Sequence, residues 1–256
     1  MSDYEIAVIF IAVVGSAIIK NGVGVGAGIF LLPFLALVLP PKLALGLGAP
    51  AMLVSDLVGV KNYWGEWNRK ELKILLPLAA LGVLFGCYLI KVTPDTLFKQ
   101  FVGVFALMFS SVHIAKMIMA RYFSLSRADK HPVKKSNQGS LSTVLFGFLG
   151  GVASTVAHAG GLMMSAYLIQ KRANPRVFVG TLVLFFAIIN CFKLVAYLNI
   201  GIITSQTMLL VCILSPAIIL GGYAGNALNK KIPQQLFRLI VLVLIFFIGI
   251  RLQWTA

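Results

Sequence analysis

Residues 19–32 read IKNGVGVGAGIFLL, with four glycines at alternate positions directly after a lysine and an asparagine. Apolar sequence continues on both sides of this stretch. Because glycine costs a helix interior about 1 kcal/mol relative to alanine, four of them together predict that a helix is interrupted here. Inside a bilayer, a broken helix is tolerated only where its backbone is buried in protein or lines a watery cavity.

The composition favours an all-α membrane protein. The chain has 256 residues, of which 59% are hydrophobic and 11% charged, and its mean hydropathy is +0.96. Several apolar runs exceed about 18 residues, the length expected of membrane-spanning helices. The net charge of +15 lies mainly between these runs, so we attribute it to orientation in the membrane and expect no nucleic-acid partner. The acidic start, residues 1–5, lacks the positive charge of a cleavable signal peptide.

The cysteines indicate neither a metal site nor a cofactor. Cys87, Cys191 and Cys212 lie in separate apolar segments without metal-ligand spacing. We expect three ordinary buried thiols.

The chain divides into two similar halves. A polar segment at 120–139 separates a first transmembrane repeat, 1–119, from a second one, 140–256, and we expect this linker in the cytoplasm. The apolar runs fall at about 6–40, 43–60, 74–91, 96–119, 140–170, 176–198, 204–227 and 233–250. The repeat places Pro77 opposite Pro216, Gly82 opposite Gly221, Gly86 opposite Gly225, Gly28 opposite Gly161, Gly46 opposite Gly180, and Asp56 opposite Asn190. Such a match in one register predicts an internal duplication.

The distribution of Lys and Arg favours inverted repeats. If every run crosses the membrane, the basic residues are nearly balanced between the two sides. If runs 6–40 and 140–170 instead enter and return to the same side, the linker side carries a large excess of positive charge, as the positive-inside rule requires. Run 6–40 would be about 52 Å long as a helix, against about 30 Å for the hydrocarbon core. Each repeat is then a broken, re-entrant helical hairpin plus three crossings, although a tilted, broken single crossing remains an alternative.

A second break is predicted at residues 150–161, which read GGVASTVAHAGG. Each break would expose the N-terminus of a following half-helix, where unpaired N–H groups and about half a positive charge favour an anion. Discontinuous helices at corresponding positions of two repeats indicate a transport site near the bilayer midplane. The backbone candidates for substrate binding are Gly24, Gly26, Gly28, Gly160 and Gly161.

Two side chains stand beside the first break. Lys20 either snorkels to an interface or lines an anion cavity. Asn21 either donates to the same anion or caps the interrupted helix. We interpret Asp56 mainly as a salt-bridge or helix-end residue near Lys61, with coupling to a proton or cation as the minor alternative.

Four further candidates lie in the second repeat. His158 is either a structural residue or a ligand that binds the anion or relays a coupling proton, given an unperturbed pKa of about 6.5. The Ser154 hydroxyl lies nearby, with bonding back to the helix as its structural role. Lys193 is equally compatible with snorkelling and with substrate contact. Asn190 lies one turn earlier on roughly the same face, where an interhelical hydrogen bond is the structural alternative.

These motifs resemble the sulfite exporter TauE/SafE family of membrane permeases over nearly the whole chain. The resemblance rests on Gly22–Gly28 followed by Pro33, on Ala44–Gly48, on Gly147–Gly151 and on the pair Gly160 and Gly161. It implies transport of small sulfur-containing anions such as sulfite and organosulfonates. The second break departs from the first, because STVAHA replaces the strict glycine alternation.

We therefore predict a secondary transporter in a bacterial inner membrane, which binds a small anion between the two breaks and works by alternating access. A coupling proton is a further candidate partner, and no enzymatic activity is expected. Two alternatives are a proton- or cation-coupled permease for another solute, using Asp56, and an intramembrane enzyme with Ser154 as nucleophile and His158 as base.

Overall fold

The computed structural model describes residues 2–23, 26–123, 140–171, 174–228 and 234–254, and in these ranges the chain forms helices and no strand. The helices are α1 Asp3–Val23, α2 Ala27–Leu35, α3 Pro41–Asn62, α4 Arg69–Val92, α5 Asp95–Phe123, α6 Ser140–Ala157, α7 Gly160–Gln170, α8 Pro175–Asn199, α9 Ser205–Leu228 and α10 Gln234–Trp254. Helix α5 therefore continues past the predicted boundary at residue 119, and positions 124–139 of the predicted linker lie outside the described residues.

The predicted all-α membrane class is confirmed. In the described part of the chain, six helices are long and apolar enough to cross a membrane, namely α1, α3, α4, α5, α8 and α9. The predicted six crossings had included α10 in place of α1. Helix α1 has 21 residues and so measures about 31 Å, close to the bilayer core. The first arm of this hairpin is therefore longer than the half-helix that we predicted.

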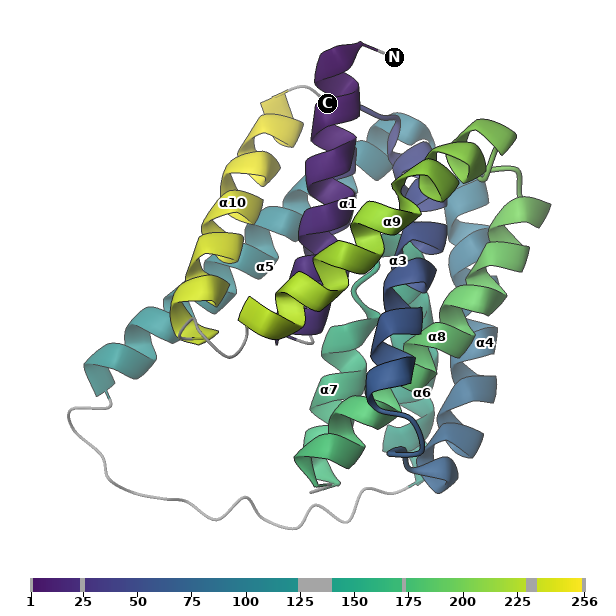
Figure 1. The fold of residues 1–256 in the computed structure, drawn as a ribbon, viewed down its shortest axis with the longest axis vertical. Helices are drawn as coiled ribbons and strands as arrows, with labels where there is room; N and C mark the ends of the chain where they lie inside the picture. The colour runs from purple at the N-terminus through teal and green to yellow at the C-terminus, as the bar shows by residue number, and fades with distance from the viewer. Residues whose placement is uncertain (1, 24–25, 124–139, 172–173, 229–233, 255–256) are drawn as a thin grey trace.

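Both predicted interruptions are present. Helix α1 ends at Val23 and α2 begins at Ala27, with the left-handed backbone of Gly26 (φ 97°) between them. In the second repeat α6 ends at Ala157, and His158 adopts a left-handed φ of 50° before α7 begins. Helix α1 packs on α2 and α6 packs on α7, so each run turns back on itself as a hairpin. In Figure 1, α1 descends from the N-terminus while α6 and α7 occupy the opposite end of the bundle.

The two halves are interleaved. Helix α1 packs against α9, and its counterpart α6 packs against α4. Helix α3 packs against α8, and α5 packs against α10 (Figure 1). The main helix pairs thus join the predicted first repeat, 1–119, to the predicted second one, 140–256.

Glycines at matched positions permit this close packing. A Cβ on Gly225 would collide with the backbone of Ile18 in α1, and a Cβ on Gly86 would collide with Thr155 in α6. A Cβ on Gly46 of α3 would meet the carbonyl of Ile202 in the segment after α8, and a Cβ on Gly180 of α8 would meet the carbonyl of Glu66 in the segment after α3. Each of these contacts has its counterpart in the other half, which explains why the glycines recur in one register.

The outer surface is apolar, as lipid contact requires. Residues such as Leu57, Leu220 and Phe247 are more than half exposed. Cys87 is buried, but Cys191 and Cys212 are exposed, so the prediction of three buried thiols is wrong for two of them. The reason is that an apolar residue in a membrane protein can face lipid as readily as the protein core.

A cluster of polar contacts links the C-terminal end of α7 to α4 and α6. The hydroxyl of Tyr167 donates a hydrogen bond to Glu71 Oε2 of α4 at 2.5 Å, and Thr143 of α6 lies 3.4 Å from the same hydroxyl. Lys171 forms an ion pair with Glu71 at 3.5 Å. These contacts connect α4, α6 and α7 at the end of the hairpin opposite its break.

Candidate functional site

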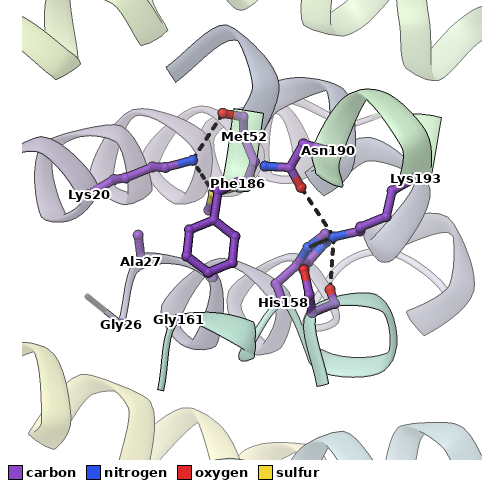
Figure 2. Close-up of a pocket in the computed structure, with 11 residues that line it drawn as sticks. Lys20, Gly26, Ala27, Met52, His158, Gly161, Phe186, Asn190 and Lys193 are labelled. Carbon is purple, nitrogen blue, oxygen red and sulfur yellow. Dashed lines mark hydrogen bonds between the residues drawn. The ribbon is translucent and has the colours of Figure 1, made fainter. Parts of the chain in front are cut away.

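A cavity of about 50 Å³ lies between the two breaks. A buried water needs about 10–15 Å³ on the same scale, so the cavity has room for about three to five water molecules or a small anion. Figure 2 shows side chains from both halves reaching into it. Its lining consists of Lys20, Gly26, Ala27, Gly28, Met52, Ser154, His158, Gly161, Phe186, Asn190 and Lys193.

Lys20 enters the cavity from the last turn of α1. Its Nζ lies 2.6 Å from Asp56 Oδ1 and donates to the carbonyl of Met52 at 3.2 Å. The Lys20 side chain is 16% exposed, whereas that of Asp56 is 0% exposed. Asp56 does belong to a salt bridge, but its partner is Lys20 across the helix packing rather than the expected Lys61 nearby in sequence.

Asn190 joins the two charged groups of the site. Its Nδ2 donates to Asp56 Oδ2 at 2.7 Å, and its Oδ1 accepts from Lys193 Nζ at 3.4 Å. The polar chain Lys20–Asp56–Asn190–Lys193 therefore runs from α1 through α3 to α8. Asp56 and Asn190, which are opposite one another in the sequence repeat, are in direct contact.

Lys193 is fully buried and does not snorkel, because its side chain points into the protein. Its Nζ donates to the carbonyl of Ser154 at 2.8 Å and lies 2.9 Å from His158 Nδ1 (Figure 2). An ammonium group carries only donors, so with Lys193 charged the ring nitrogen accepts and the neutral ring holds its proton on Nε2. Lys193 of α8 therefore stabilises the second break through hydrogen bonds to Ser154 and His158.

The His158 ring is oriented by its surroundings. Its Nε2 is buried and has no hydrogen bond of good geometry to the described residues. A Cβ on Gly48 of α3 would collide with this atom, and a Cβ on Gly28 would collide with the His158 carbonyl. The two breaks therefore touch directly, and they do so because glycine stands at both contact points.

The site carries excess positive charge. With both lysines protonated, Lys20 and Lys193 contribute two cations, and Asp56 is the single carboxylate among the described residues that line or contact the cavity. The N-termini of α2 and α7 also meet the cavity, and in this described region their N-cap residues, Gly26 and Ala159, supply no side-chain cap. Helix N-termini add partial positive charge and unpaired N–H donors. The arrangement is suited to a small anion and leaves one positive charge to be balanced.

Two of the predicted residues, Asn21 and Gly160, are described by the structure and are not part of this lining. Asn21 donates to Ser55 Oγ at 3.0 Å and to the carbonyl of Ala17, so it joins α1 to α3 behind the cavity. Gly160 packs against Ser154. Gly24 lies outside the described residues. The other eight predicted residues line the cavity, namely Lys20, Gly26, Gly28, Ser154, His158, Gly161, Asn190 and Lys193.

The sequence reasoning missed three contributors. Asp56 was interpreted mainly as a salt-bridge or helix-end residue near Lys61, with proton or cation coupling as the minor alternative, although the repeat aligned it with the candidate site residue Asn190. Met52 and Phe186 form apolar parts of the lining, and nothing in their sequence context distinguishes them from core residues.

The geometry does not form a nucleophile–base pair. Nδ1 of His158 faces Lys193, and Nε2 lies against Gly48. Neither ring nitrogen is therefore directed at the Ser154 hydroxyl, as activation of a serine nucleophile requires.

A bundle of apolar helices with a cationic cavity between two interrupted helices defines a membrane permease rather than an enzyme. Residues 8–252 match the family described as "Sulfite exporter TauE/SafE", and the chain belongs to this family. It is also similar to the "Probable membrane transporter protein YunE" of Bacillus subtilis (strain 168), with 23% identity over 259 residues, covering 91% of this chain and 92% of the relative. No solved structure gives a significant match.

Proposed function

We propose that the protein is a secondary transporter for a small sulfur-containing anion, such as sulfite or an organosulfonate, and that it resides in a bacterial inner membrane. The anion occupies the cavity between the two breaks, near the middle of the bilayer. Lys20, the N-terminal N–H groups of α2 and α7, and the Asn190 and Ser154 side chains replace its water of hydration. Movement of α1, α2 and α9 against α4, α6 and α7, two groups that each combine helices from both repeats, alternates access between the two sides.

One observation carries this proposal, namely that two lysines, Lys20 and Lys193, line one cavity beside a single carboxylate, Asp56, in the described part of the chain. A buried charge without a partner is strongly unfavourable, so with both lysines protonated this arrangement favours binding of one negative charge. The volume limits the ligand to a few heavy atoms, and the Met52 and Phe186 walls accommodate a small apolar substituent. The family description supports sulfite and related anions as the chemical class.

Binding of matched probes tests the charge requirement. We expect sulfite and methanesulfonate to bind the purified protein at a single site, detected by isothermal titration and by a raised unfolding temperature. Dimethyl sulfone has nearly the shape of methanesulfonate without its charge and is expected not to bind. Equal binding of the sulfone, or no binding of either anion, contradicts an anion site.

The proposal includes an inverted arrangement of the repeats, 1–119 and 140–256, with the linker 120–139 in the cytoplasm. The starts of α4 and α9 then lie on opposite sides of the membrane. With the native cysteines replaced, Lys70→Cys at the start of α4 is expected to react with an impermeant maleimide only after cells are permeabilised. Gln206→Cys at the start of α9 is expected to react in intact cells. If both introduced cysteines react from the same side of the membrane, the repeats are parallel and the inverted arrangement is wrong.

A further inference from the structure

Asp56 lies behind Lys20 as seen from the cavity. Lys20 lines the cavity, whereas Asp56 is outside the lining and its side chain is fully buried. Of its two oxygens, Oδ2 accepts from Asn190 at 2.7 Å, and Oδ1 has Lys20 as its ion-pair partner, with no other partner in the described residues. Any anion that draws the Lys20 ammonium toward the cavity therefore competes with Asp56 Oδ1.

The charge of the anion decides whether Asp56 can stay ionised. A monovalent anion balances Lys20, Lys193 and Asp56 to a neutral site. A divalent anion leaves one negative charge in excess, next to a buried carboxylate that is losing its counter-ion. Such a carboxylate is strongly disfavoured unless it is neutralised.

We propose that Asp56 is a proton-binding site that is filled when a divalent anion occupies the cavity, so that one proton is bound and carried with each dianion. This inference rests on the proposed function. The proton adds to Oδ1, because Oδ2 remains the acceptor of the Asn190 amide. Lys20 is the connection to the cavity. It can pass a proton to Oδ1 across the 2.6 Å contact and regain one that reaches the cavity from solution, so that one proton leaves solution and one carboxylate is neutralised.

Asp56 is favoured over the alternative proton acceptor, His158, even though the groups that face Asp56 stabilise its ionised form when no dianion is bound. These groups are Lys20 from α1 and Asn190 and Lys193 from α8. His158, at the second break, lies 2.9 Å from the Lys193 ammonium. A protonated ring there would place two cations in contact, whereas a proton on Asp56 removes a negative charge.

Two anions of fixed charge and similar tetrahedral shape test the proposal. Sulfate is divalent and methanesulfonate monovalent between about pH 6 and pH 8, because neither titrates near the range of protein side chains. We expect the apparent sulfate affinity to fall about tenfold per pH unit, as uptake of one proton requires. Methanesulfonate affinity is expected to change much less. In weakly buffered solution, sulfate binding should take up about one proton per site, and methanesulfonate binding should take up none.

Variants assign the proton to its residue. Asp56→Asn is expected to abolish the pH dependence of sulfate binding. Asp95→Asn, the same change at the exposed Lys42 ion pair, should retain it. Identical pH profiles for both anions in the wild-type protein, or rejection of sulfate at every pH, overturn the proton site while leaving the anion site intact. Failure of both anions to bind contradicts the proposed function itself. The wild-type proton count remains decisive if Asp56→Asn does not fold.

Discussion

Replacing Lys20 with methionine is expected to abolish anion binding and to destabilise the protein by about 3–5 kcal/mol, because it leaves the buried Asp56 carboxylate without its counter-ion. The same change removes the excess positive charge of the site, since Lys193 and Asp56 then balance. Titration with methanesulfonate measures the first effect, and unfolding of the detergent-solubilised protein measures the second.

Two further variants separate these effects. Lys20→Met combined with Asp56→Asn is expected to recover most of the stability, because no buried charge is left unpaired. Binding is expected to stay weak, because Lys193 remains engaged with Ser154 and His158. Lys42→Met removes a lysine from an ion pair that is far more exposed and is expected to leave binding unchanged. Wild-type affinity in Lys20→Met would exclude Lys20 from the site.

Replacing Lys193 with methionine is expected to abolish anion binding. It should lower the free energy of unfolding by less than Lys20→Met does. The Ser154 carbonyl and His158 Nδ1 lose their donor, and each unsatisfied buried group costs about 1–3 kcal/mol. Removal of a fully buried ammonium that has no carboxylate in direct contact offsets part of this cost. The net change in the free energy of unfolding should stay below that of Lys20→Met. Increased hydrogen exchange at the α6–α7 break is the accompanying structural signature.

The matched control is Lys91→Met, which removes an exposed lysine from the last turn of α4. It should change neither binding nor exchange at the break. A destabilisation by Lys193→Met as large as that of Lys20→Met would show that our assignment of the buried charges is wrong.

The helical class and both interruptions were predictable because they depend on local chemistry. Apolar runs specify membrane helices through hydropathy alone, and the glycines at residues 22–28 oppose a continuous helix whatever surrounds them. The left-handed φ of His158 was not predicted, because only contacts with α2 and α3 hold a non-glycine residue in that conformation.

The charge pairing could not be predicted in the same way. Lys61 is closer to Asp56 in sequence than Lys20 is, but the packing of α1 on α3 decides which lysine reaches the carboxylate. The depth of Lys193 was misjudged for a related reason. Distance along α8 measures the position of Lys193 relative to the helix end, whereas its burial comes from the neighbouring helices.

The connection of α7 to α4 restricts which parts of the protein can move independently. Glycine packing holds α6 on α4, and the Tyr167–Glu71 hydrogen bond holds the far end of α7 to the same helix. We expect these three helices to move together, and we expect α2 and α9, which both pack on α1, to move with α1 as their counterpart. Helices α3 and α8 run between these two groups of helices and bring Asp56, Asn190 and Lys193 to their boundary, so any sliding of the groups changes the ion-pair distances directly.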